Sequence, residues 1–138
     1  MDNLINWFKL LFFLKTVLIT SSPIALGDEW VVVTPQEPLE AITGGAAIYV
    51  DVSKYVDPLD FEKGEKRLPV GLVEGELETT SGKTIFLRSA GTSHANDSVR
   101  LIVTSGAPIP VGVEFVKVRL KSERPLEGVN VYWKNGSH

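Results

Sequence analysis

Histidine, serine and carboxylate groups are the residues of this chain that could support acid–base or nucleophilic catalysis. The sequence has two histidines, His94 and the C-terminal His138, and His94 lies beside Ser93 and near Asp97. A catalytic triad needs a nucleophile, a base and an orienting acid that converge in space. Neighbours in one loop rarely provide that geometry, and the G-x-S-x-G sequence of a nucleophile elbow is absent. We therefore expect His94 to be a solvated loop residue and the protein not to be an enzyme.

The second group that could do chemistry is acidic. Asp57, Asp60 and Glu62 lie close together, and calcium prefers such clusters of oxygen ligands. The spacing lacks the Asp-x-Asp-x-Asp-Gly arrangement, however, and lysines lie nearby. The chain has no cysteine, which excludes thiolate metal sites and disulfides, and it has no glycine-rich phosphate-binding motif. We expect a solvated acidic loop, no metal site and no cofactor.

Two β-rich runs near the C-terminus, 112–121 and 126–134, are expected to form a hairpin through a four-residue loop at 122–125. This register pairs Val118 with Val129 on the face that points inward. The other inward residues of the predicted hairpin are Val116, Leu120, Val131 and Trp133.

The outer face of the predicted hairpin is the candidate binding surface. Phe115, Lys117, Arg119 and Tyr132 are assigned to it, and Phe115 is placed opposite Tyr132. Exposed aromatic rings beside basic groups can bind a protein segment, a glycan or an anionic headgroup. Single aromatic residues are also common on surfaces without a function, and a neighbouring loop could cover these. The four residues are therefore binding candidates that need a structural test.

The rest of the chain must supply the elements that position these residues. From Trp30 onward, short β-rich runs alternate with turn residues, and no segment has helical periodicity over ten residues. The expected strands are 29–34, 46–54, 70–79, 83–89, 98–105, 112–121 and 126–134. Alternating apolar and polar positions are typical of antiparallel sheets over a shared core. We expect an all-β fold: a small antiparallel β-sandwich, immunoglobulin-like, with about seven strands.

One further hairpin can be registered from local residues. A three-residue loop that ends at Gly82 puts this glycine in the left-handed conformation of a type I turn with a G1 bulge. Leu77 then lies opposite Ile85 on the apolar face, and Glu74 lies opposite Arg88 on the polar face. A two-residue loop would place acidic residues opposite apolar ones, so we reject it.

The N-terminal segment has the pattern of an export signal. An apolar stretch at 10–19 is followed by Ala25 and Gly27, which place small residues at the third and first positions before a cut after Gly27. We assign 1–27 as a signal peptide and 28–138 as the β-sandwich domain. Two alternatives stay open, an uncleaved membrane anchor and a segment that belongs to the fold.

Charge and export together favour a protein partner. The formal net charge is −3, which argues against a nucleic-acid partner held through phosphate contacts. We expect a non-enzymatic binding or assembly-accessory (chaperone-like) protein of the periplasm or cell surface, acting through a sheet edge or through the last hairpin. Its partner would be another envelope or extracellular protein, with membrane contact only through an uncleaved N-terminal segment. The alternative is a structural subunit of an extracellular polymeric assembly.

Two sequons for N-glycosylation begin at Asn96 and Asn135. They matter only if the protein is exported in a cell that glycosylates its secreted proteins, which the sequence does not show.

Overall fold

The computed structural model describes residues 16–52, 71–90 and 98–135. In these ranges the protein is all-β, with eleven strands and no helix, and hence no helix long and apolar enough to span a membrane. The strands are β1 (Val17–Leu18), β2 (Ile24–Leu26), β3 (Val31–Val33), β4 (Leu39–Glu40), β5 (Ala47–Asp51), β6 (Val73–Thr79), β7 (Thr84–Ser89), β8 (Ser98–Val103), β9 (Glu114–Ser122), β10 (Leu126–Val129) and β11 (Val131–Lys134). The prediction of an all-β fold is confirmed.

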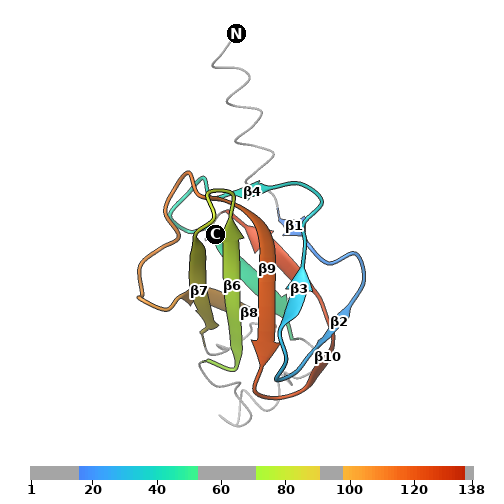
Figure 1. The fold of residues 1–138 in the computed structure, drawn as a ribbon. Helices are drawn as coiled ribbons and strands as arrows, with labels where there is room; N and C mark the ends of the chain where they lie inside the picture. The colour runs from blue at the N-terminus through green and yellow to red at the C-terminus, as the bar shows by residue number, and fades with distance from the viewer. Residues whose placement is uncertain (1–15, 53–70, 91–97, 136–138) are drawn as a thin grey trace.

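Nine of the strands form one antiparallel sheet. Its order is β1-β11-β5-β8-β7-β6-β9-β3, with β4 also paired to β9, while β10 and β2 form a separate two-stranded sheet. The large sheet is curled, so that β6, β7 and β9 lie in front of the core and β5 lies behind it in Figure 1. The core therefore lies inside a single curled sheet rather than between a sheet and helices.

The core is filled by the inward residues of the alternating strands. Its largest completely buried side chains are Ile48, Leu72, Leu77, Leu87, Leu101, Phe115, Leu120, Leu126 and Trp133. Gly75 leaves the space that two of them need, because a Cβ atom there would lie 2.8 Å from Cδ2 of Leu101 and 3.1 Å from Cδ2 of Leu120. The missing side chain on β6 thus lets leucines of β8 and β9 pack over it.

The β6–β7 hairpin has the register that the sequence predicts. Leu77 lies opposite Ile85, and Glu74 lies opposite Arg88. Gly82 has a φ of +88°, and its N–H donates a hydrogen bond to the Thr79 carbonyl oxygen at 3.0 Å. A local turn fixes this pairing, so the pattern of neighbouring residues was enough to predict it.

The predicted hairpin between 112–121 and 126–134 is wrong. Strand β9 pairs with β6 along one edge and with β3 and β4 along the other, whereas β11 pairs with β5 and β1, and β10 pairs with β2. A strand has only two edges, and both edges of β9 are occupied. The run at 126–134 is also two strands, which separate at Asn130.

A β-bulge in β9 changes which side chains of this strand face the core. Lys117 lies opposite Glu78, but the next pair is Phe115 with Thr79, so Val116 is an extra residue without an opposite partner. One extra residue turns all the following side chains to the other face. Phe115, expected outside, is therefore completely buried, and Val116, expected inside, is only half-buried.

Residues 16–27 lie within the fold. Ile19 and Leu26 are core residues, the Ile19 N–H donates to the Val131 carbonyl oxygen at 2.8 Å, and the Ser122 N–H donates to the Gly27 carbonyl oxygen at 2.6 Å. Strands of two or three residues are too short to show alternation, so an apolar run of this kind resembles a signal segment. Cleavage after Gly27 stays a prediction, and it would remove these contacts.

Candidate functional site

A groove lies beside the start of β7. Its volume is about 780 Å³, and it is bounded by the β6–β7 hairpin, by β7 and by the β8–β9 connection at 104–113. Apolar residues line much of it, among them Ile85, Phe86, Val103, Pro108, Val111 and Val113. The connection is the orange loop beside β7 in Figure 1.

The groove exists because β8, which runs antiparallel to β7, ends before it reaches the start of β7. The last backbone contact between them is the hydrogen bond from the Thr104 N–H to the Phe86 carbonyl oxygen, at 3.0 Å. The chain then turns, with a φ of +85° at Gly106 and a hydrogen bond from its N–H to the Val103 carbonyl oxygen at 2.8 Å. In the part of the chain that the structure describes, no strand pairs with the beginning of β7, at Thr84, on that side.

The backbone of Thr84 faces this open side. Backbone groups alternate in direction along a strand, so those of Thr84 point the same way as those of Phe86, toward the place that β8 has left. Within residues 16–52, 71–90 and 98–135, neither the N–H nor the carbonyl oxygen of Thr84 has a hydrogen-bond partner. The groove therefore contains a short free strand edge.

The other wall of the groove is the β8–β9 connection, which is anchored but does not pair with β7. Ile109 is buried in the core, and the Gly112 N–H donates to the Ala41 carbonyl oxygen at 2.7 Å. Proline at Pro108 and Pro110 removes two backbone donors, which makes this segment a poor sheet partner. The groove thus stays open beside a fixed wall.

Two large apolar side chains are exposed at the groove, and polar residues line part of its rim. Phe86 is 56% exposed and Val111 is 65% exposed. The polar rim residues are Thr79, Thr80, Ser81, Lys83, Thr84, Thr104, Ser105 and Glu114. An apolar cavity with a few polar groups and a free strand edge suits the binding of an extended, partly apolar ligand.

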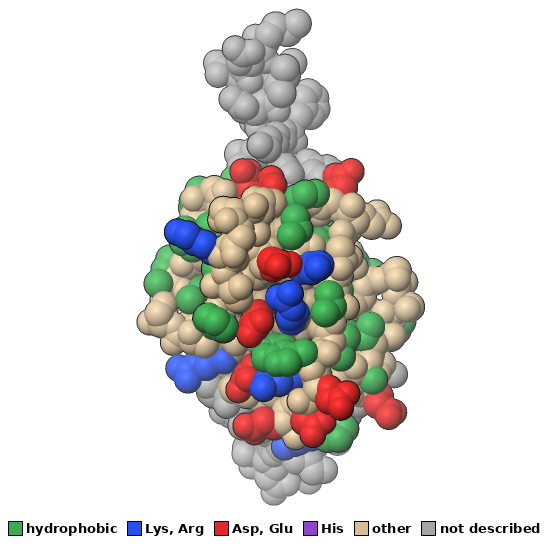
Figure 2. Space-filling model, viewed as in Figure 1, with side chains coloured by type: hydrophobic (Ala, Val, Ile, Leu, Met, Phe, Trp, Pro, Cys, Tyr) green, Lys and Arg blue, Asp and Glu red, His purple; other side chains and the backbone are tan. Residues whose placement is uncertain are grey.

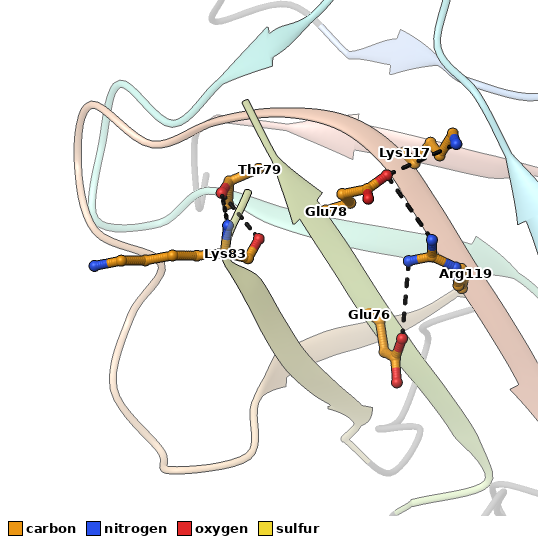
Figure 3. Close-up of polar contacts among 6 residues, drawn as sticks. All are labelled: Glu76, Glu78, Thr79, Lys83, Lys117 and Arg119. Atoms are coloured by element: carbon orange, nitrogen blue, oxygen red, sulfur yellow. Dashed lines mark hydrogen bonds and ion pairs between the residues drawn. The ribbon is translucent and has the colours of Figure 1, made fainter. Parts of the chain in front are cut away.

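The predicted site residues Lys117 and Arg119 do lie on the outer face of β9, but they are paired with acids of β6. Lys117 Nζ lies 3.8 Å from Glu78 Oε2, and Arg119 lies 3.9 Å from Glu76 Oε2 and 3.8 Å from Glu78 Oε2, as Figure 3 shows. Their positive charges are therefore paired with acidic side chains of the same sheet. A binding role for these two residues stays a prediction.

The ion pairs continue along both strands and form what we call the charge ladder. Its members are Glu74, Glu76 and Glu78 on β6, and Lys117, Arg119 and Lys121 on β9. Lys121 Nζ lies 3.5 Å from Glu74 Oε2 and 4.7 Å from the centre of the Trp30 ring. In Figure 2, acidic and basic side chains alternate over this face, so it is not a basic stripe.

The two aromatic candidates do not join this face. Phe115 was expected on the surface opposite Tyr132, and that placement is wrong because Phe115 is in the core. Tyr132 lies on β11, where its ring stacks on Tyr49 with centroids 5.5 Å apart and ring planes 8° from parallel. Its hydroxyl is hydrogen-bonded to the Ser98 hydroxyl at 2.5 Å. The four candidate residues thus do not form one surface.

The remaining candidates from the sequence fall into two groups. His94, the acidic cluster at 57–62 and Asn96 lie outside the described residues. Asn135 is buried: its Oδ1 accepts a hydrogen bond from the Ile42 N–H at 2.7 Å, and its Nδ2 donates to the Glu40 carbonyl oxygen at 2.9 Å. The folded chain therefore does not present the Asn135 amide for glycosylation. Among the described residues, no group of three or more His, Asp and Glu side chains could hold a metal ion.

The sequence alone predicts only part of the groove. Alternation along 83–89 places Phe86 on the polar face, where an exposed aromatic ring is notable. Nothing local places the connection at 104–113 beside β7, because that contact depends on the whole sheet order.

No family model matches the chain, and no curated protein or solved structure is significantly similar to it. Its function has to be argued from its own geometry.

Proposed function

We propose that this protein is a non-enzymatic binding domain that captures an extended segment of a partner protein in the groove beside β7. The observation that carries the proposal is the free strand edge at Thr84, which lies next to exposed apolar side chains. A partner segment would add to the sheet there, in the position where β8 stops. Its backbone would bond to Thr84, and its side chains would bury Phe86 and Val111.

The energetics favour a segment of a protein over a compact small molecule. Unpaired backbone groups of Thr84 are satisfied by another backbone, and each hydrogen bond made contributes about 0.5–1.5 kcal/mol. Burial of apolar surface adds about 25 cal/mol per Å². Both terms are available together only to a ligand with an extended backbone and apolar side chains.

The proposal includes the setting and the finer fold. The apolar N-terminal stretch followed by small residues supports an exported protein of the periplasm or cell surface, with an envelope or extracellular protein as its partner. The contact between Phe115 of β9 and Trp133 of β11 supports an immunoglobulin-like sandwich, because these strands do not pair and face each other through the core.

The matched substitutions Thr84→Pro and Thr84→Val test the strand edge. Proline removes the free N–H and blocks strand addition, but the pairing of β7 with β6 does not use that N–H. Valine keeps the N–H and the strand preference. Peptides selected from a short random library on the wild-type protein should bind the Thr84→Val protein and not the Thr84→Pro protein, with both variants melting near wild type.

The apolar part of the groove has its own pair of variants. Phe86→Ser should weaken the selected peptides, whereas Val32→Ser, at a residue of β3 that is 53% exposed and away from the groove, should not. In NMR spectra, the changes in backbone amide chemical shift on peptide addition should be largest at β7 and at 104–113. If no peptide is selected, or if Thr84→Pro binds as well as wild type, the proposal is wrong.

The alternative, a structural subunit, has one observation in its favour. β3 lies at one end of the large sheet, and Val32 is exposed on it, so β3 could supply a strand to another copy. Sedimentation of the wild-type protein over a range of concentrations decides between them. Open-ended oligomers that Thr84→Pro abolishes would favour the subunit.

A further inference from the structure

The register of a captured segment follows from the ladder that it would continue. Leu87 lies opposite Val103, and the Phe86 carbonyl oxygen accepts the Thr104 N–H. A segment antiparallel to β7, like every neighbour in this sheet, would therefore place one residue opposite Thr84 and exchange two hydrogen bonds with it. The residue before it in the segment would lie opposite Ile85, and the residue after it would lie opposite Lys83.

The position opposite Ile85 has an apolar surrounding. Ile85 is half-buried and lines the groove together with Val103 and Val113, which are also half-buried. An unpaired polar side chain would lose its hydration there without gaining a partner. An apolar side chain is thus favoured at this position of the segment.

The position opposite Lys83 lies beside the positive charge of this lysine, which has no ion-pair partner among the described residues. The Lys83 backbone is held by Thr79, whose hydroxyl accepts the Lys83 N–H at 3.0 Å and donates to its carbonyl oxygen at 2.9 Å. Its side chain is exposed and extends away from the charge ladder in Figure 3. Within the described residues the Lys83 ammonium has no ion-pair partner, whereas Lys117 and Lys121 each pair with one glutamate and Arg119 pairs with two.

Among the described residues, Glu114 is the only other charged residue that lines the groove, and it does not form an ion pair with Lys83. Glu114 lies on β9 opposite Glu40, and its backbone carbonyl accepts the Thr80 N–H at 2.9 Å. No ion pair joins the carboxylate of Glu114 to Lys83 in the described chain. A carboxylate on the captured segment would therefore give this lysine an ion-pair partner that the described residues do not provide.

We infer that the groove selects an extended segment in which an apolar residue is followed, two positions later, by a carboxylate that pairs with Lys83. This inference rests on the proposed function, since it names the chemistry of the segment bound at the same edge. The carboxylate is that of an aspartate or glutamate side chain, or that of the C-terminus of the partner. A lysine or arginine at the same position would be repelled.

The test uses a synthetic probe with the sequence Thr-Val-Thr-Val-Thr-Glu-Thr-Thr, labelled with fluorescein at its N-terminus and amidated at its C-terminus. The matched probe carries Gln in place of Glu. A third probe ends at that Gln with a free carboxylate. Dissociation constants are measured by fluorescence anisotropy for the wild-type, Lys83→Gln and Lys117→Gln proteins. Lys117 is the control because it is also exposed but belongs to the charge ladder.

The wild-type and Lys117→Gln proteins should bind the Glu probe about two- to five-fold more tightly than the Gln probe, which is the range of an exposed ion pair. Lys83→Gln should remove this preference, and so should about 1 M salt. A gain for the third probe over the Gln probe would assign the carboxylate to a chain end. A gain for the Glu probe alone would assign it to a side chain.

The inference is wrong if Lys83→Gln keeps the preference, or if wild type binds the Glu and Gln probes equally while Thr84→Pro binds neither. In the second case the strand edge, and with it the proposed function, would stand. If the probes do not bind and the peptide library also yields no ligand, the proposed function itself fails.

Discussion

Phe115 and Trp133 pack edge to face in the core, with their ring centroids 4.8 Å apart and their ring planes at 65°. Both side chains are completely buried. They come from β9 and β11, which are not neighbours in the sheet, so the contact joins two parts of the curled sheet through its interior. Edge-to-face aromatic pairs contribute about 0.5–1.5 kcal/mol beyond the burial of their surface.

The bulge at Val116 leads to the first prediction. Phe115→Ala should destabilise the protein by about 3–5 kcal/mol, because it opens a cavity against Trp133. Val116→Ala, one residue further along, should cost about 1 kcal/mol or less, since Val116 is only half-buried. Urea unfolding of both variants measures the difference. The reverse order of the two effects would mean that β9 has the unbulged register.

The same residues show what the sequence can and cannot predict. Alternation assigned Trp133, Val118 and Leu120 to the core, and they are buried there, since each lies on a stretch without a bulge. It assigned Phe115 to the surface, because a bulge adds one residue without any mark in the apolar pattern. Alternation also gives the face of a strand but not its neighbours, so it could not separate a hairpin from two strands in different parts of the sheet.

The candidate site divides in the same way. The sequence predicts the polar face of β9. The acids that pair with Lys117 and Arg119 come from β6, and the pairing of β6 with β9 joins segments that are distant in the chain. The groove depends on where β8 stops and on where the connection at 104–113 lies against β7. The ion pairs of β9 and the groove both depend on contacts between segments distant in the chain, and local patterns in a single sequence do not predict such contacts.

Gly82 provides the second prediction, at the turn that local residues do determine. Its φ of +88° is unfavourable for a β-branched residue, so Gly82→Val should cost about 1 kcal/mol or more. Gly44→Val is the matched control. Gly44 has open space around the position of a Cβ atom and does not have a left-handed backbone. If thermal unfolding gives equal losses for the two variants, the turn does not depend on the left-handed glycine.

The third prediction concerns the N-terminal boundary. A chain that begins at Asp28 lacks Ile19 and Leu26, and burial of one such side chain contributes about 1.5–3 kcal/mol. It should therefore be less stable than a chain that begins at Thr16 by about 3 kcal/mol or more, with the difference measured by urea unfolding. The chain from Thr16 is the control, since it keeps β1 and β2.

Equal stability of the two truncated chains would mean that β1 and β2 are dispensable, and cleavage after Gly27 would then be compatible with the fold. The intact mass of the protein from its native compartment answers the complementary question. A mass that corresponds to a chain starting at Asp28, together with the expected loss of stability, would mean that the mature domain has a smaller free energy of unfolding than the chain from Thr16.

The charge ladder gives the last prediction. Arg119 lies between Glu76 and Glu78, so Arg119→Glu replaces two attractions with two repulsions across the β6–β9 pairing. Like charges on neighbouring strands destabilise a sheet, and each exposed pair contributes about 0.2–1 kcal/mol, so the expected loss is about 1 kcal/mol. Combining it with Glu76→Arg should recover part of that loss, because one pair is restored in the opposite orientation.

The control is Arg124→Glu, at an exposed residue after β9 with no ion-pair partner in the described chain, which should be nearly neutral. Unfolding at low salt and again at about 1 M salt separates charge from packing, since screening should reduce the loss. A loss that does not change with salt, or that the second substitution does not reduce, would show that Arg119 acts through the packing of its side-chain stem.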